Sequence, residues 1–419
     1  MGRPDEPGSY SILSIAPTSF FYDYGCHVRI LEEAIALQKL GHRITICTYN
    51  SGSDVDGLDI RRTPPIPWRK GVEVGSSRHK IGFDTLLAGT VLSTALRLRP
   101  DVIHGHLHEG AAIGAAVGRL IGAPVVLDFQ GSLTEEMVDH HFLSRQGAYY
   151  GLWRRAEKLI DRLPDAIVTS SGSAVSVLTN DFHCPPGKVH VVPDGVNADV
   201  FHPLAHEGIG CNKQEVAALR QRLGLPEQRQ VVVYLGLLAE HQGTSHLLRA
   251  AAHVVRQRPD THFLIMGFPN VEGYYQEALA LGLGRNVSFP GRIPYGKAPL
   301  YLALGDVAVS PKMSSTEGAG KLLNYMAMGL PTVSFDTPVA REYLGDDGLY
   351  ATLGDAEAFA AAIIQLLGNG DQRAALSDSL RRRAVEQFSW QQMGERIVAI
   401  YDRLLDRGRM DTGSDGRGR

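Results

Sequence analysis

The stretch from Ser310 to Pro331, SPKMSSTEGAGKLLNYMAMGLP, decides how the second half of this chain folds. A short apolar strand ends at Ser310, a glycine-containing loop follows, and a helix begins near Lys321. Gly329 and Pro331 stop that helix and lead into a further apolar strand, Thr332–Phe335. A strand, a glycine-rich loop, a helix and a second strand are typical of the βαβ unit of a parallel sheet.

The same alternation of short apolar strands and helices extends outward from this stretch. In the first half, strands are predicted at Ser11–Ala16, Arg43–Tyr49, Asp59–Arg62, Asp101–His104, Pro124–Asp128, Asp165–Thr169 and Val189–Val192. In the second half, strands are predicted at Gln230–Leu235, His262–Met266, Val287–Pro290, Val307–Ser310 and Thr332–Phe335. Helices are predicted at Val28–Leu40, Phe83–Leu98, Gly110–Ile121, Lys213–Leu223, His246–Arg256, Pro299–Leu304, Lys321–Met328, Ala356–Leu367 and Asp371–Phe388. The pattern predicts an α/β protein with two Rossmann-like, doubly wound domains that face each other across a cleft.

The division into domains follows from the length of the chain and from a break in this rhythm. At 419 residues the chain is too long for one ordinary core, and two domains of roughly 200 residues each are expected. The segment from Asn197 to Pro226 is irregular, which indicates a junction. We expect a flexible N-terminus at 1–9, an N-terminal domain at 10–200, a linker region at 201–228, a C-terminal domain at 229–388, a last helix at 389–406 and a disordered tail at 407–419.

The composition favours an ordinary cytoplasmic protein. The net charge of −3 at pH 7 gives no reason to expect a nucleic-acid partner. The four cysteines have no CxxC spacing, so neither a zinc site nor a disulfide framework is expected. The polar N-terminus does not resemble a signal peptide, and no apolar run reaches the length of roughly 18 residues that a membrane-spanning helix needs.

The loop after Ser310 has features that suit a phosphate-bearing ligand. The start of a helix offers unpaired N–H groups and a partial positive charge, and Gly318 and Gly320 allow a ligand to approach the backbone closely. The carboxylate of Glu317 is placed to accept hydrogen bonds from sugar hydroxyls, and Asn324 lies one turn into the helix, within reach of a ribose. Taken alone, the loop is also compatible with an ordinary strand–loop–helix crossover, although less well.

Motifs elsewhere in the chain make the interpretation specific. The stretch resembles the donor-binding signature of the retaining, family-4-type glycosyltransferases (glycosyl transferases group 1), which have the GT-B fold. Further matches to that family are Gly25–Arg29 with Glu32–His42, Asp101–His106, Val191–Asn197 with Phe201–Pro203, and Phe388–Trp390. The likeness runs in one order from about Ser11 to Leu405, so it does not depend on a single loop.

The resemblance implies roles for individual residues. Glu317 contacts the donor sugar, Gly25 approaches the donor phosphate, and His106 reaches the transferred sugar from the N-terminal side. Backbone N–H groups hold the donor, those of Gly318, Ala319 and Gly320 at the sugar and those of Leu322 and Leu323 at the diphosphate. The resemblance also implies that a donor phosphate oxygen takes the acceptor proton. Neither a metal nor a cofactor is then needed, and the nucleotide-diphosphate sugar is a co-substrate.

The cationic clamp expected for the diphosphate is missing. The family usually has Gly-Arg-x-x-x-x-Lys-Gly, whereas this chain has Gly236 to Gly243 with Leu237 in place of Arg and Gln242 in place of Lys. Each charge-assisted bond to a phosphate contributes about 1.5–3 kcal/mol, so two losses are not a small change.

We hypothesise that Lys312 and Lys321, which flank the phosphate loop, supply the replacement charge; the alternative is that both are solvated surface lysines. Two further departures replace a titratable residue by an uncharged amide. Asn324 stands where the family has a second Glu, and Gln130 stands where a His is common. We keep Gly236, Gln242 and Gln130 as donor-site positions.

Three alternating histidines raise the question of a metal, namely His104, His106 and His108. No carboxylate or cysteine lies near them at the sequence spacing of metal ligands, so we predict no metal site. Asp54-Val-Asp56 resembles the metal motif of the other glycosyltransferase fold, but it is predicted to be a surface turn beyond the second strand.

The acceptor is left open by the sequence. The basic segment Trp68–His79 and the aromatic segment Glu135–Arg155 are each compatible with an anionic acceptor, with peripheral contact at the inner membrane face, or with a plain solvated surface. The leading hypothesis is a retaining glycosyltransferase that moves a sugar to a hydroxyl of a glycan, a lipid or a small molecule. The alternatives are a non-catalytic GT-B partner subunit and a nucleotide-sugar epimerase or phosphorylase on the same fold.

Overall fold

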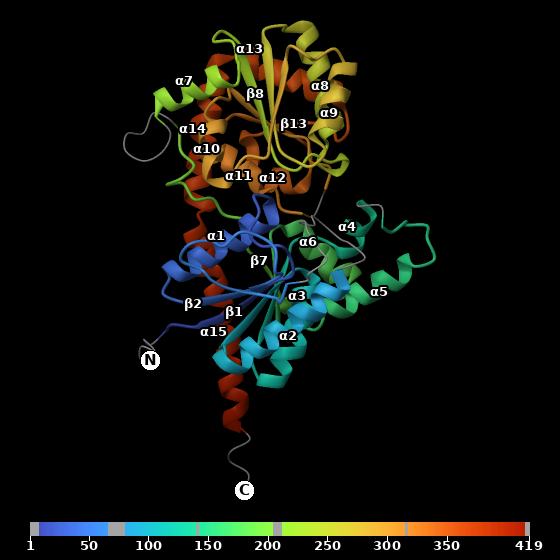
Figure 1. The fold of residues 1–419 in the computed structure, drawn as a ribbon, viewed down its shortest axis with the longest axis vertical. Helices are drawn as coiled ribbons and strands as arrows, with labels where there is room; N and C mark the ends of the chain where they lie inside the picture. Colours follow the sequence, from blue (N-terminus) through green and yellow to red (C-terminus); the bar gives the residue numbers. More distant parts are fainter. Residues whose placement is uncertain (1–7, 66–79, 140–141, 204–211, 315–316, 415–419) are drawn as a thin grey trace.

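The structure is a computed structural model that describes residues 8–65, 80–139, 142–203, 212–314 and 317–414. The basic segment Trp68–His79 and the ends of the chain at 1–7 and 415–419 lie outside the described residues. The chain forms two lobes, one above the other, and a pair of long helices runs down one side of both (Figure 1).

Each lobe is built on one parallel sheet. The N-terminal sheet has the order β3-β2-β1-β4-β5-β6-β7 and the C-terminal sheet the order β10-β9-β8-β11-β12-β13. The first seven strands are β1 (Ser11–Ala16), β2 (Arg43–Thr48), β3 (Asp59–Arg62), β4 (Val102–His106), β5 (Val125–Phe129), β6 (Ala166–Thr169) and β7 (Val189–Val191). The other six are β8 (Gln230–Leu235), β9 (Thr261–Met266), β10 (Val287–Gly291), β11 (Val307–Ser310), β12 (Thr332–Phe335) and β13 (Leu349–Ala351). The strand order reverses direction beside β1 and beside β8, which is where doubly wound sheets bind ligands.

Helices cover both faces of each sheet. Those of the N-terminal lobe are α1 (Gly25–Lys39), α2 (Lys80–Leu98), α3 (Leu107–Ile121), α4 (Leu133–Asp139), α5 (Tyr150–Ile160) and α6 (Gly172–Ser176). Those that follow are α7 (Lys213–Arg222), α8 (Thr244–Gln257), α9 (Val271–Ala280), α10 (Ala298–Leu302), α11 (Gly320–Ala327), α12 (Pro338–Leu344), α13 (Ala356–Gly368), α14 (Gly370–Gln387) and α15 (Trp390–Ser414). Because helices cover them on both sides, the central strands are buried along their whole length and read as continuous apolar runs.

The last helix returns to the N-terminal lobe. Trp390, Met393, Ile397 and Tyr401 of α15 are buried in the same core as Ile12 of β1. The helix continues to Ser414. A disordered tail was expected from residue 407, whereas the structure is helical over residues 407–414. Once a helix is nucleated by packing, each added residue costs little, and no proline interrupts this segment.

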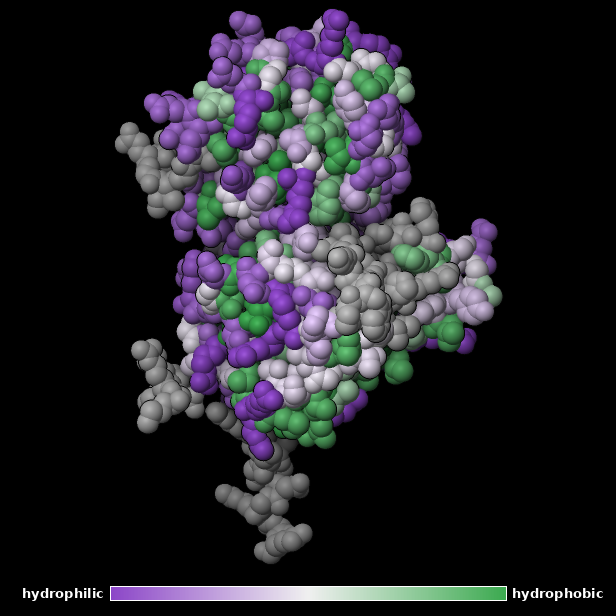
Figure 2. Space-filling view, in the orientation of Figure 1, coloured by the Kyte–Doolittle hydropathy of each residue, from purple (hydrophilic) through white to green (hydrophobic). Residues whose placement is uncertain are grey.

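The two lobes touch on both sides of the cleft between them. On one side Asp23 accepts hydrogen bonds from Arg292 at 2.5 Å and from the backbone N–H of Tyr295 at 2.7 Å. On the other side Glu342 accepts a bond of 2.7 Å from the N–H of Gly172. Figure 2 shows a mainly hydrophilic outer surface, with hydrophobic residues gathered at the end of the N-terminal lobe away from the cleft, where Leu96 and Leu120 are exposed.

Candidate active site

A cleft of about 350 Å³ lies between the lobes, at the carboxyl ends of the central strands. This volume falls within the usual range of ligand pockets. Eleven of the residues predicted to bind the donor line it, namely Gly25, Gln130, Gly236, Gln242, Lys312, Glu317, Gly318, Ala319, Gly320, Lys321 and Asn324. The structure therefore brings most of the predicted site residues together from both lobes.

Two helices begin at the cleft from opposite sides. Gly25 starts α1 and Gly320 starts α11, and neither helix has a side-chain cap at its N-cap residue. A Cβ added at Gly25 would meet nothing within 4 Å, so there is room for a ligand beside that helix start. The N–H of Leu322 instead bonds Ala319 O at 2.7 Å, and the side chains of Leu322 and Leu323 are buried away from the cleft.

Glu317 lines the cleft and approaches the N-terminal lobe closely. Its Oε2 lies 3.0 Å from Nζ of Lys312, which also donates to Gly318 O at 2.6 Å. A Cβ added at Gly131 of the N-terminal lobe would lie 2.8 Å from Cγ of Glu317, and the φ of +150° at Gly131 also favours glycine. Lys312 is buried and committed to holding this loop, so it is not a solvated surface lysine.

Lys321 reaches the position of the missing clamp. Its Nζ donates to Oε1 of Gln242 at 3.1 Å and to the hydroxyl of Tyr234 at 3.3 Å, and it lies 4.6 Å from the centre of the Tyr234 ring. A Cβ at Gly236 would lie 2.8 Å from this Nζ, so Gly236 makes room for the lysine itself. Burial, reinforced by repulsion from Lys312, lowers the pKa of Lys321 to about 7.

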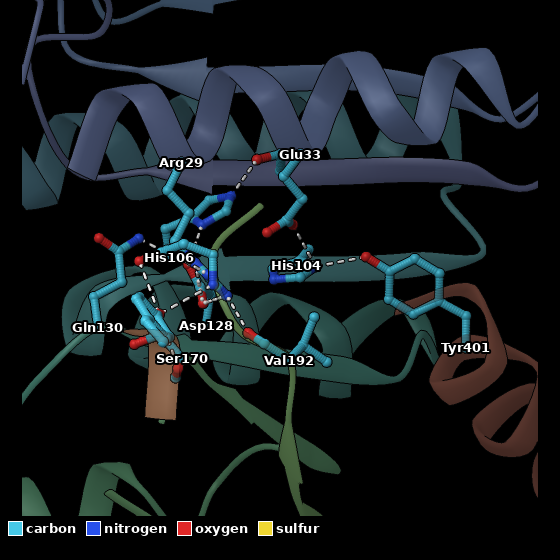
Figure 3. Close-up of polar contacts among 12 residues, drawn as sticks. Arg29, Glu33, His104, His106, Asp128, Gln130, Ser170, Val192 and Tyr401 are labelled. Atoms are coloured by element: carbon cyan, nitrogen blue, oxygen red, sulfur yellow. Dashed lines mark hydrogen bonds and ion pairs between the residues drawn. The ribbon is translucent and has the colours of Figure 1, made fainter. Parts of the chain in front are cut away.

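A network of buried charges lies behind the cleft wall of the N-terminal lobe (Figure 3). Arg29 of α1 donates to both carboxylate oxygens of Asp128 at 3.0 Å and to Asp194 at 2.8 Å. Burial alone would raise the pKa of Asp128, but Arg29 and His106 outweigh it and hold that pKa well below its usual range. Gln130 Nε2 donates to the same carboxylate at 2.7 Å and extends the network to the cleft.

The structure corrects the expectation for His106. Its Nδ1 lies 3.0 Å from Asp128 and its Nε2 lies 3.1 Å from the hydroxyl of Ser14, and only 2% of the residue is exposed. It does not line the cleft, because both of its ring nitrogens contact side chains inside the N-terminal lobe. His104 is likewise internal, with Nδ1 bonded to the Tyr401 hydroxyl of α15 at 2.5 Å.

Two contributors to the site were not assigned a role from the sequence. Arg29 lies in the Gly25–Arg29 motif, and Asp194 lies in the Pro-Asp-Gly turn of the linker. Asp194 lines the cleft, and its Oδ2 would be 2.4 Å from a Cβ at Gly318. The sequence could have pointed to them, because each is a charged residue inside a motif that resembles the family. Only the structure shows that the two charges form an ion pair.

Other sequence expectations find their place away from the cleft. Asp54 pairs with Arg62 in an exposed loop, as predicted for a surface turn. Glu135 bonds Arg145 and the Tyr150 hydroxyl and does not line the cleft, whereas its neighbour Glu136 does. In the described part of the chain, no helix is both long and apolar enough to cross a membrane.

Comparison with known proteins gives the same division of the chain. The model of Glycosyltransferase Family 4 matches residues 25–200, and that of Glycosyl transferases group 1 matches residues 215–383. The chain is 26% identical over 407 residues to a D-inositol 3-phosphate glycosyltransferase of Thermobispora bispora, covering 91% of this chain and 90% of that protein. It is 26% identical over 416 residues to an MMP alpha-(1->4)-mannosyltransferase of Mycolicibacterium hassiacum, covering 91% and 95%.

Solved structures share the fold. Sucrose-phosphate synthase of Thermosynechococcus elongatus superposes with a TM-score of 0.78 at 18% identity, covering 95% of this chain and all of the other. HepE of Anabaena, solved with UDP and glucose, gives a TM-score of 0.74 at 15% identity, covering 94% and 99%.

Two facing Rossmann-like lobes with a ligand cleft at the strand ends define an enzyme of the GT-B class. Within that class, the chain belongs to family 4 of the glycosyltransferases (glycosyl transferases group 1), whose members transfer sugars from nucleotide-sugar donors.

Proposed function

We propose that this enzyme moves a sugar from a nucleotide-diphosphate sugar to an acceptor hydroxyl with retention of anomeric configuration and without a metal at the reaction centre. The C-terminal lobe holds the donor and the N-terminal lobe holds the acceptor. The observation that carries the proposal is the position of Lys321, whose ammonium enters the cleft beside Gln242 and Gly236.

The donor diphosphate lies between the two uncapped helix starts. The partial positive charges of α1 and α11 and the charge of Lys321 surround one part of the cleft, and all three favour an anion there. Stabilising the charge that develops on the leaving diphosphate is the main contribution the protein makes to catalysis. The retained positive charge argues against a non-catalytic partner subunit.

The transferred sugar lies against Glu317. Lys312 fixes one carboxylate oxygen and the loop backbone, so the carboxylate is oriented before a hydroxyl arrives. The close contact between Glu317 and Gly131 places the sugar at the boundary of the two lobes, where an acceptor from the N-terminal lobe can meet it. A donor phosphate oxygen then takes the acceptor proton on the face from which the acceptor attacks.

The acceptor carries a hydroxyl and belongs to a glycan, a lipid or a small molecule. One side of α5 supports contact with the cytoplasmic face of a membrane, because Tyr149 and Leu152 are exposed there beside Arg155 and Lys158. Among the relatives, a GDP-mannose-dependent mannosyltransferase of Corynebacterium glutamicum acts on a phosphatidylinositol monomannoside, and it is 28% identical over 216 residues.

The test begins with a thermal-shift panel of nucleoside diphosphates, which identifies the nucleotide that raises the melting temperature. The matching nucleotide-sugars are then incubated with candidate acceptors, and NMR of the product gives the anomeric configuration. An inverted product overturns retention. Nucleotide binding without release from any donor supports the partner subunit, and an altered donor sugar without an acceptor supports an epimerase.

A further inference from the structure

A second group of titratable side chains lies outside the cleft, between α3 and α5. His108, in the first turn of α3, faces Glu157 near the end of α5 and Asp161 at its C-cap. All three are buried, with at most 3% of any of them exposed. His108 Nε2 lies 3.2 Å from Oδ1 of Asp161 and 3.6 Å from Oε1 of Glu157, and the three side chains each bring one donor atom within 4.8 Å of the others.

The hydrogen bonding of this cluster is incomplete. Among the described residues, His108 Nε2 and both carboxylate oxygens of Asp161 make no hydrogen bond of acceptable geometry. The 3.2 Å between His108 Nε2 and Asp161 Oδ1 is the distance of an ion pair when His108 is protonated, and it leaves Asp161 Oδ2 without a hydrogen bond from any described residue. Polar atoms buried in this way destabilise a fold unless something else satisfies them.

Glu157 is held in place from the opposite side. Its Oε1 accepts a bond of 2.8 Å from the N–H of Leu133, and its Oε2 accepts bonds from the N–H and the hydroxyl of Thr134. These donors fix the carboxylate and still leave lone pairs on it, as outer-shell partners of metal ligands do.

We propose that His108, Glu157 and Asp161 bind one divalent transition-metal ion. One imidazole nitrogen and two carboxylate oxygens form a ligand set that Zn²⁺ and Mn²⁺ accept. Ligand atoms about 2.1 Å from one ion at tetrahedral angles are about 3.4 Å apart, which matches the two measured separations. The double positive charge also balances the two carboxylates, which are costly to bury uncompensated.

The ion has a structural role. None of its ligands lines the cleft, so the site is separate from glycosyl transfer and does not depend on the proposed function. It joins the start of α3 to the end of α5, and through Glu157 it supports the first residues of α4. The sequence pattern singled out His108 among three alternating histidines but not its two carboxylate partners, because Glu157 and Asp161 come 49 and 53 residues after it.

A second buried cluster, of two histidines and one carboxylate, serves as the control. Glu33, His104 and His106 also bring donor atoms within 4.8 Å of one another. There, however, His106 contacts Asp128 and Ser14 with its two ring nitrogens, and His104 bonds Tyr401. Most of the ring nitrogens in this second cluster already contact other side chains, so we assign no metal ion to it.

The test uses the full-length protein, dialysed against a chelator and then titrated with Zn²⁺ and, separately, Mn²⁺. We expect about one tightly bound ion per chain by mass spectrometry of the metal content, a melting temperature that rises with added metal, and visible absorption bands when Co²⁺ is used. Asp161→Asn is expected to lose the bound ion and the metal-dependent rise, whereas Glu33→Gln keeps both.

Two results would overturn the proposal. A wild-type protein that retains no ion, takes up no Co²⁺ and melts at one temperature with or without metal shows that the cluster is an ion pair of protonated His108 with the two carboxylates. An ion that remains in Asp161→Asn, or that leaves in Glu33→Gln, shows that metal binds elsewhere. If Asp161→Asn does not fold, the Co²⁺ spectrum of the wild-type protein still tests the proposal. Absorption bands of Co²⁺ with an imidazole ligand support the site, and a lack of Co²⁺ uptake contradicts it.

Discussion

Replacing Lys321 by Gln removes the one charge that reaches the position of the missing clamp, and it keeps the hydrogen-bonding capacity of the side chain. Lys321 Nζ is one donor among several around the diphosphate, so the loss is that of a single charge-assisted bond, about 1.5–3 kcal/mol. At about 1.4 kcal/mol for each factor of ten, kcat/KM for the donor should fall about 10- to 150-fold. Steady-state nucleotide release measures this, with Lys213→Gln on exposed α7 as the control.

The pH dependence separates a charge effect from a packing effect. The pKa of Lys321 is lowered to about 7, so in the free enzyme the side chain loses its charge as the pH rises through 7. A diphosphate favours the charged form, and donor binding above pH 7 must therefore take up a proton. kcat/KM, which reports the free enzyme, should fall up to tenfold per pH unit above about 7 in the wild type. The Gln variant should lack this dependence.

A double substitution provides the refutation. Lys321→Gln combined with Gln242→Lys exchanges two side chains that already touch at 3.1 Å, and it returns the positive charge to the same place. We expect it to recover most of the lost kcat/KM. If Lys321→Gln keeps wild-type kcat/KM at pH 6 and pH 8, Lys321 does not stabilise the diphosphate and the electrostatic argument is wrong.

Three further outcomes are expected from substitutions around the cleft. Glu317→Gln should lower kcat/KM about tenfold or more while leaving the Kd of the bare nucleoside diphosphate unchanged, since we propose that the carboxylate binds the donor sugar and not the nucleotide. Gly131→Ala should lower kcat, because its Cβ would lie 2.8 Å from Cγ of Glu317. The control Gly89→Ala on α2 should leave kcat unchanged, because a Cβ there meets nothing within 4 Å. Pre-steady-state nucleotide release distinguishes the two variants. Asp128→Asn should lower the free energy of unfolding in urea by about 3–5 kcal/mol, because it leaves Arg29 buried and half paired.

Much of the fold could be predicted because the strands are covered on both sides. Runs such as Gln230–Leu235 and Val307–Ser310 are apolar and bounded by turn residues, and the structure confirms both to the residue. The elements missed include two helices of ordinary length, α5 and α9, and several that are short or atypical. β13 has three residues, and α12 begins with Pro338 at its first position behind the Thr337 cap.

The site was less predictable because long side chains end far from their backbone. The sequence placed Lys321 at the start of a helix, but not its Nζ beside Gln242, 79 residues earlier. It kept Gly236 as a donor-site position, and the structure adds that the missing Cβ leaves room for Nζ of Lys321. It also placed His106 at a strand end, where the register of β4 with β5 pairs it with Asp128 and draws it inward.

These observations link the departure from the family motif to a property of the enzyme. A guanidinium stays charged at any physiological pH, so a clamp built on Arg does not titrate. In the proposed site the charge comes from Lys321, whose pKa is lowered by burial. The space that buries it is formed by Gly236, Gln242 and Tyr234. The same burial strengthens its interaction with a diphosphate once the proton is bound, because little water screens the pair. With the donor bound as proposed, this exchange of clamp positions is expected to couple donor binding to proton uptake near neutral pH.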